Sequence, residues 1–198
     1  MLFRSSKCRW FNAYSNAQFH LGMYDLYLPR FKMDCHNMTN WSCDVFRAQG
    51  IPSVYEFTPQ LTDQVNRHFW CVSPDSAGIL QPYSAPYTSL GEEWKNGTCK
   101  AGKVYRRTFG SQKNIPFYLA GENEFIPPLF DTPLLNDQTY RYHQTVTLHL
   151  PFNEKLSNNL AYLCMWANGE LSVVGWGKIN HQKKEIVYEQ VQIGRAHV

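Results

Sequence analysis

The sequence lacks the features that mark several large classes of protein. It has no apolar run approaching the roughly 20 residues that cross a bilayer, so it predicts no membrane span. Neither G-x-G-x-x-G nor G-x-x-x-x-G-K-[ST] occurs, and there is no G-x-S-x-G nucleophile elbow. The formal net charge of +3 is too small to indicate a nucleic-acid partner. We therefore expect no nucleic acid, no metal and no other cofactor.

The composition is that of a folded chain. Of the 198 residues, 43% are hydrophobic and 15% are aromatic, which is more apolar surface than disordered segments carry. The start, Met1 to Lys7, lacks the apolar core of a signal peptide. The last six residues, 193–198, resemble the in-frame translation of a sequencing adapter. We exclude them from the fold and expect the natural chain to continue past Gln192.

The cysteines give the best indication of compartment. Their number is even and no C-x-x-C pair occurs, so they favour disulfides over a redox motif or a zinc ribbon, and 15 pairings stay open. Three glycosylation sequons begin at Asn37, Asn40 and Asn96. Together they predict a secreted, extracellular glycoprotein, the alternative being a reduced protein with buried thiols. The disulfide candidates are Cys8, Cys35, Cys43, Cys71, Cys99 and Cys164.

Residue alternation predicts β-structure in the last third of the chain. In 144–150 the apolar Val146, Leu148 and Leu150 fall on one face, which we expect to be core. A more fully buried strand is expected over 171–178, where paired glycines flank a tryptophan, and a third over 185–192. The proline-rich 125–133 is expected to be a connection.

One helix is predicted, over 58–69. Thr58 would cap it, Pro59 would occupy the first turn, and Leu61 and Phe69 would share a face. The fold class is therefore expected to be all-β, an antiparallel barrel or sandwich over 100–192. A small cysteine-rich β region over 1–99 would precede it.

Several segments of the second half resemble the middle of a trypsin-like serine protease. In that family an apolar strand follows the triad aspartate, a cysteine ends a long connection, and a G-W-G strand comes next. The segment 117–123 is similar to the family's V-x-L-G-E-x-N strand, and Cys99 stands near the place of its A-A-H-C cysteine. The segments that carry the resemblance are 145–152, 160–164, 171–178 and 187–192.

The resemblance implies a chymotrypsin-like barrel without its chemistry. Thr98 stands at the position of the triad histidine and Gln144 at that of the aspartate, and neither can act as base or as charged partner. A serine motif would lie beyond Gln192. The resemblance thus implies a catalytically inert, secreted protease homologue that acts through protein contacts.

Other interpretations stay open. The stretch from Cys35 to Cys99, with Trp94 before the last cysteine, is similar to the end of a sushi module. A noncatalytic module that binds an extracellular glycan or protein is the first alternative function, since aromatic faces stack on sugars. Its exposed candidates are Trp10, Trp41, Trp70 and Trp94. A jelly-roll structural protein, such as a capsid subunit, is the third.

Overall fold

The computed structural model describes residues 9–10, 32–62, 67–85, 87–94, 99–167 and 169–193. The fold is mostly β, with antiparallel sheets and few helices, as the alternation predicts. The chain divides into two compact units: unit 1 is Met1–Phe57 with His68–Thr98, and unit 2 is Thr58–Arg67 with Cys99–Val198. None of the helices described is long and apolar enough to cross a membrane.

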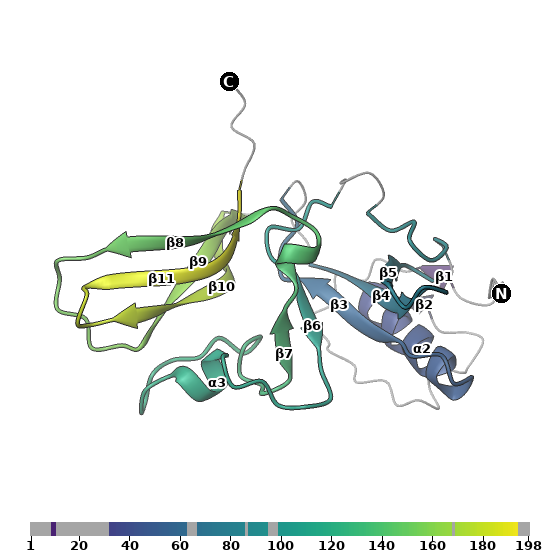
Figure 1. Ribbon diagram of the computed structural model, residues 1–198, viewed down its shortest axis with the longest axis horizontal. Helices are drawn as coiled ribbons and strands as arrows, with labels where there is room; N and C mark the ends of the chain where they lie inside the picture. Colours follow the sequence, from purple (N-terminus) through teal and green to yellow (C-terminus); the bar gives the residue numbers. More distant parts are fainter. Residues whose placement is uncertain are drawn as a thin grey trace, which may run out of the picture. The chain divides into compact units, whose positions relative to one another are not determined.

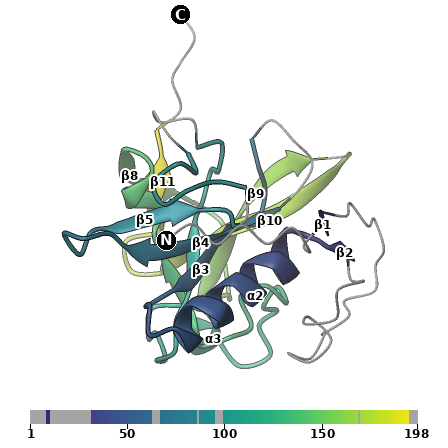
Figure 2. The same cartoon turned by 90° about the vertical axis from the view of Figure 1, so that its right-hand side faces the viewer.

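Unit 1 places one long helix along antiparallel strands. The order of its strands is β5-β4-β3, and Cys71 of β4 lies opposite Tyr83 of β5. Helix α2 packs against β4, as Figures 1 and 2 show. A short parallel pair, β1 with β2, completes the described part. The bounds are β1 Arg9–Trp10, β2 Lys32–Met33, α2 Cys35–Ala48, β3 Val54–Thr58, β4 His68–Pro74 and β5 Leu80–Tyr83.

Local signals define helix α2. Asp34 is the N-cap, and its Oδ1 accepts a hydrogen bond from the Asn37 backbone N–H at 2.8 Å. The helix ends where Gly50 takes a φ of +77°, a conformation that glycine adopts without steric cost. Its buried face holds Met38, Thr39, Trp41, Ser42 and Cys43. The sequence interpretation missed this helix because it assigned the cysteines of this region to loops.

The helix predicted over 58–69 is wrong. Thr58 ends β3, and its hydroxyl donates to the Gln60 carbonyl at 2.8 Å, which is a turn contact and not a helix cap. Leu61 forms an isolated antiparallel bridge with Ala101, and Phe69 is buried within β4. Apolar residues four positions apart share one face of an extended chain as well as one face of a helix. The spacing of Leu61 and Phe69 therefore does not distinguish the two structures.

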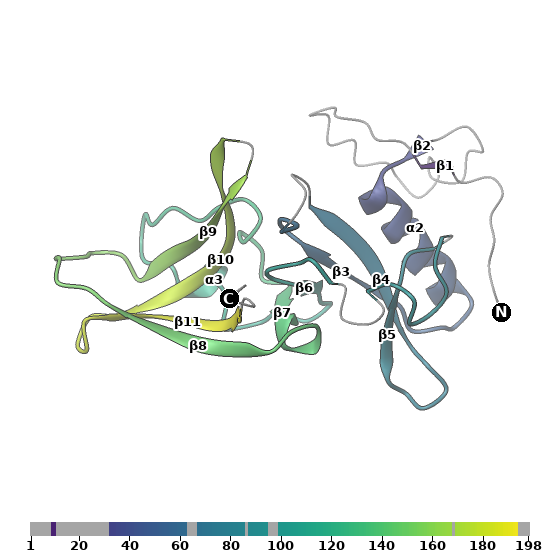
Figure 3. The ribbon, with the colours of Figure 1, turned by 90° about the horizontal axis from the view of Figure 1, so that it is seen from above.

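Unit 2 contains the three strands that the sequence predicts. Residues 144–150, 171–178 and 185–192 fall on β8, β10 and β11, and the sheet order is β8-β11-β10-β9 (Figure 3). A second ladder pairs β6 with β7, and the predicted connection over 125–133 holds no helix or strand. The bounds are β6 Tyr105–Arg107, α3 Pro116–Leu119, β7 Leu135–Asp137, η2 Thr139–Arg141, β8 Thr145–Pro151, β9 Leu160–Ala167, β10 Glu170–Asn180 and β11 Glu185–Gln192.

The paired glycines of β10 do allow close approach. The β9–β10 register shifts between Val173 and Gly175, and a Cβ added to Gly177 would stand 2.8 Å from the Tyr188 ring. Between them Trp176 stacks on Tyr105, with ring centroids 5.6 Å apart. The close approach expected of these glycines is confirmed, and the aromatic rings form core beside them.

Two expectations for unit 2 are wrong. Val146 is 43% exposed and Leu150 is 41% exposed, so the apolar face of β8 is not core. The segment 117–123, expected to be a strand, instead begins in the short helix α3, where Pro116 occupies the first turn. Proline at that position is pre-organised for a helix and its missing N–H costs nothing there.

Candidate active site

The first residue of helix α2 is a cysteine that lies near a histidine of β4. Cys35 follows the Asp34 cap directly, so its thiol lies at the positive end of the helix dipole. It is close enough to His68, the first residue of β4, to raise the pKa of that imidazole. The packing of α2 on β4 therefore brings a thiol and an imidazole together across 33 positions of the chain.

A carboxylate holds the other side of the imidazole. Nε2 of His68 lies 3.2 Å from Oε1 of Glu93, and their side chains are only 27% and 13% exposed. His68 thus has a carboxylate on one ring nitrogen and a thiol nearby, and these are the residue types that activate a nucleophile and orient its base.

The turn before Glu93 is fixed by its own hydrogen bonds. Gly91, at a φ of +80°, donates its N–H to the Pro82 carbonyl of β5 at 2.9 Å. The Thr88 hydroxyl donates to Oε2 of Glu93 at 3.4 Å and accepts from the Ser84 N–H at 2.7 Å. Both carboxylate oxygens of Glu93 therefore have donors, and its orientation toward β4 does not depend on the histidine alone.

Two tryptophans enclose the imidazole. The His68 ring stacks on Trp70 with centroids 5.8 Å apart, and Trp94 meets it edge-on at 5.6 Å. Trp94 has a φ of +59°, which is rare for a bulky residue and is found at sites where the surroundings enforce it. Its buried Nε1 has no hydrogen-bond partner among the described residues. These rings remove water from one side of the imidazole.

The electrostatics favour charged forms of both partners. Burial opposes a charge on His68, but hydrogen bonds with Cys35 and Glu93, and their negative charges, raise its pKa to about 9. Burial likewise opposes a charge on Glu93, yet the donors His68 and Thr88 hold its pKa below the usual value. Near neutral pH the site therefore contains an imidazolium paired with the Glu93 carboxylate.

Comparison with known proteins adds no name to this geometry. No family model, curated protein or solved structure matches the chain. The assignment of the site therefore depends on its own contacts. In the part of the chain that the structure describes, no group of three or more His, Cys, Asp or Glu side chains is arranged to hold a metal ion.

The expected protease positions do not form this site. Thr98 lies outside the described residues, and the Gln144 carbonyl accepts a hydrogen bond from the Ile193 N–H at 3.1 Å. The imidazole and the acid that are in contact, His68 and Glu93, belong to unit 1 and not to the predicted protease segments.

The structure describes five of the six disulfide candidates. Cys35, Cys43, Cys71 and Cys164 are free thiols. Cys99 is buried, and Cys8 lies outside the described residues.

The other candidates have structural surroundings. Trp70 is fully buried and Trp41 is 8% exposed, so neither ring has the exposed face that stacking on a sugar requires. The prediction that these two tryptophans are exposed is wrong. Trp10 has no described side chain and Asn96 lies outside the described residues. Asn37 and Asn40 lie on α2, and the hydroxyl residues of their sequons, Thr39 and Ser42, are buried.

A sequence signal for the site was present but weak. An N-cap aspartate followed by cysteine opens a stretch with apolar residues at 38 and 41, and a cysteine with a distant histidine is a candidate nucleophile. Six cysteines and seven histidines made that pair impossible to select without the fold. Glu93 gave no signal at all, since it is one of two adjacent acids in a turn.

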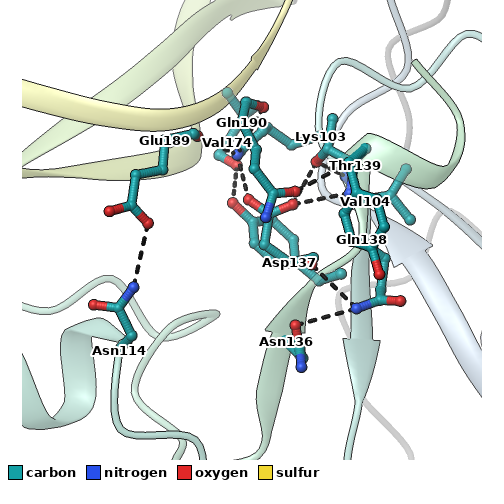
Figure 4. A network of polar contacts seen from close by, with 12 residues as sticks. Lys103, Val104, Asn114, Asn136, Asp137, Gln138, Thr139, Val174, Glu189 and Gln190 are labelled. Atoms are coloured by element: carbon teal, nitrogen blue, oxygen red, sulfur yellow. Dashed lines mark hydrogen bonds and ion pairs between the residues drawn. The ribbon is translucent and has the colours of Figure 1, made fainter. Parts of the chain in front are cut away.

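A second polar network, in unit 2, explains local structure. Lys103 pairs with Asp137 and also donates to the carbonyls of Glu189 and Gln190 at 3.0 and 3.2 Å (Figure 4). Those carbonyls lie where the β8–β11 register shifts. The Lys103 ammonium group therefore donates to acceptors that have no partner in the strand ladder. Asp137 in turn accepts from the Thr139 hydroxyl and N–H.

A cavity of about 270 Å³ lies beside this network. Four of its charged residues pair with one another, since Lys103 binds Asp137 and Lys178 lies 3.1 Å from Glu189. Asn114 donates to the same Glu189 at 3.3 Å. The polar groups of this cavity thus hold β11 and its neighbours in place, and unit 1 offers the stronger candidate for chemistry.

Proposed function

We propose that the protein is a thiol-dependent acyl-transfer enzyme, with Cys35 as nucleophile, His68 as acid and base, and Glu93 as the group that orients the imidazole. The observation that carries the proposal is the His68–Glu93 contact in unit 1, with Cys35 near enough to raise the pKa of the same imidazole. A cysteine at a helix N-terminus would not by itself indicate a nucleophile. The buried imidazole between thiol and carboxylate is what makes a nucleophile usable near neutral pH.

The reaction proceeds in two steps. The Cys35 thiolate attacks the carbonyl carbon of an amide or ester, and the His68 imidazolium gives its proton to the departing amine or alcohol. This leaves a thioester on Cys35. Neutral His68 then takes a proton from water or from an acceptor amine, which attacks the thioester carbonyl and releases the thiol. Glu93 remains ionised throughout and stabilises the imidazolium whenever it forms.

Helix α2 also suits the negative charge that develops on the carbonyl oxygen. The N–H groups of Asn37 and Met38 are occupied by Asp34, but the N–H of Cys35 lies at the first position, where the helix itself provides no acceptor. It points from the positive end of the helix dipole. A donor at that place stabilises a tetrahedral oxyanion next to the attacking sulfur.

Selective alkylation tests the nucleophile. Under limiting iodoacetamide near neutral pH, Cys35 is expected to react at least tenfold faster than Cys164. Cys164 is a matched control because it is also partly exposed but has no imidazole contact; its thiol lies 3.9 Å from the Tyr162 carbonyl. Peptide mapping by mass spectrometry gives both rates. Equal rates in the native protein would show that Cys35 is an ordinary thiol and would remove the proposal.

The serine-protease homologue stays a hypothesis from the sequence. It concerns the second half of the chain, its barrel and its protein contacts, and it is compatible with a thiol site in unit 1. A longer transcript past Gln192 tests it, because a trypsin-like relative would continue into a G-D-S-G-G segment or its remnant. The glycan- or protein-binding module and the secreted location stay predictions in the same way.

A further inference from the structure

A second pair of thiols lies within unit 1, away from the site just described. The Sγ atoms of Cys43 and Cys71 are 3.7 Å apart, although 28 positions of the chain separate them. Cys43 is on α2 and Cys71 is on β4, and the two residues are 1% and 0% exposed. Two sulfurs at this distance need a shift of less than about 2 Å to reach bonding distance, which is within the adjustment of side-chain rotamers.

Polar groups surround the two sulfurs within an otherwise aromatic cluster. The Ser53 hydroxyl donates to Sγ of Cys43 at 3.4 Å and contacts the Tyr83 hydroxyl at 3.0 Å. Cys71 donates its S–H to the Thr39 carbonyl at 3.5 Å. The hydrogen bond between Cys43 and Cys71 is the largest influence that lowers the pKa of Cys43, with burial opposing it. Cys43 is therefore the sulfur of the pair more readily ionised.

The pair joins the same two elements, α2 and β4, that carry Cys35 and His68. Cys43 is eight residues beyond Cys35 on α2, about 12 Å along the helix axis. Cys71 is three residues beyond His68 on β4, about 10 Å along the strand. A bond between the second pair would fix α2 against β4.

We propose that Cys43 and Cys71 form a structural disulfide when the protein folds with a disulfide oxidant such as oxidised glutathione. The Cys43 thiolate attacks a glutathione sulfur and releases one glutathione thiolate, which gives a mixed disulfide. The Cys71 thiol loses its proton and its sulfur attacks the Cys43 sulfur, releasing the second glutathione. Two protein thiols are oxidised and one glutathione disulfide is reduced to two thiols. Because both sulfurs are buried in the native fold, glutathione reaches them when α2 already lies on β4 but the surrounding cluster is not yet closed.

The test is a covalent map, which does not depend on any activity. The full chain, carrying Cys35→Ala to prevent exchange with the nucleophile, is refolded in glutathione buffer with the oxidised form in excess. It is then denatured in acid, blocked with N-ethylmaleimide and digested without reduction. We expect a peptide that links Cys43 to Cys71, a loss of about 2 Da for the two hydrogens, and a midpoint of thermal unfolding about 5–10 °C above that of the reduced chain.

Variants identify the pair. Cys164→Ser should keep the linked peptide and the shift in melting temperature, whereas Cys71→Ala should lose both. Blocked Cys43 and Cys71 in the refolded Cys35→Ala chain, or a peptide that links either of them to another cysteine, would overturn the proposal even if the further variants fail to fold. The result leaves the acyl-transfer proposal standing or falling by its own experiment, since no readout here uses Cys35.

Discussion

His68 Nε2 and Glu93 Oε1 lie 3.2 Å apart and join residues 25 positions distant in the chain. Burial opposes a charge on the ring, but Cys35 and Glu93 together raise the pKa of His68 to about 9. Its other neighbour, Cys35, is on a different element, so the charge on the ring depends on the register between helix α2 and strand β4. A change in the packing of α2 on β4 is therefore expected to change the charge on the His68 imidazole as well.

Removing the carboxylate should lower the pKa of His68. In Glu93→Gln the amide supplies no charge to the imidazolium, and we expect the pKa to fall from about 9 toward its usual value near 6.5. NMR titration of the histidine ring protons measures it. Glu92→Gln is the control, because Glu92 is the adjacent acid and its side chain accepts from the Ser89 N–H at 2.9 Å. A similar shift in both variants would contradict the assigned partner.

The same pKa gives unfolding a pH dependence. The pKa of His68 is higher in the folded chain than in the unfolded one, so its contribution to stability is complete below about pH 6.5 and is lost as the pH rises to about 9. Urea unfolding between these limits should show a steeper loss of stability for the unsubstituted protein than for His68→Gln. Parallel curves would mean that His68 binds its proton equally in both states.

The strands of unit 2 were predictable because their signals are local. Alternation over 185–192 needs no knowledge of the rest of the chain, and it gave β11 with its bounds. Which face of β8 is buried was not predictable, since Val146 and Leu150 alternate correctly yet remain exposed.

The candidate site could not be predicted, for a related reason. Cys35, His68 and Glu93 meet only because α2 packs on β4 and a turn anchored to β5 returns to them. The even number of cysteines favours disulfides, and a cysteine in a disulfide is not available as a nucleophile. The Asp34 cap was readable in the sequence, but the helix that it begins was not assigned.

A methyl group at Gly177 should destabilise unit 2. A Cβ there would stand 2.8 Å from the Tyr188 ring, so Gly177→Ala is expected to cost about 1–3 kcal/mol. Gly110→Ala is the matched control, because a Cβ at Gly110 meets nothing within 4 Å. Urea denaturation of both variants decides the point, and an equal small effect would mean that the β10–β11 contact is looser than described.

Breaking the buried ion pair should cost more than breaking an exposed one. Lys103→Met leaves Asp137 without its cation and the carbonyls of Glu189 and Gln190 without a donor, and we expect a loss of about 3 kcal/mol. Lys178→Met removes a pair whose side chains are 40% and 50% exposed, and should cost less than about 1 kcal/mol. The reverse order of the two variants in denaturant unfolding would contradict the role given to Lys103.

Trapping of an acyl-enzyme tests the thiol chemistry most directly. The protein is mixed with p-nitrophenyl acetate, quenched in acid within seconds and measured by intact-mass spectrometry followed by peptide mapping. We predict an acetyl adduct of about 42 Da on Cys35 that Cys35→Ala lacks and His68→Ala accumulates far more slowly. An adduct of equal yield in Cys35→Ala, or none on Cys35 in the folded protein, would contradict the account.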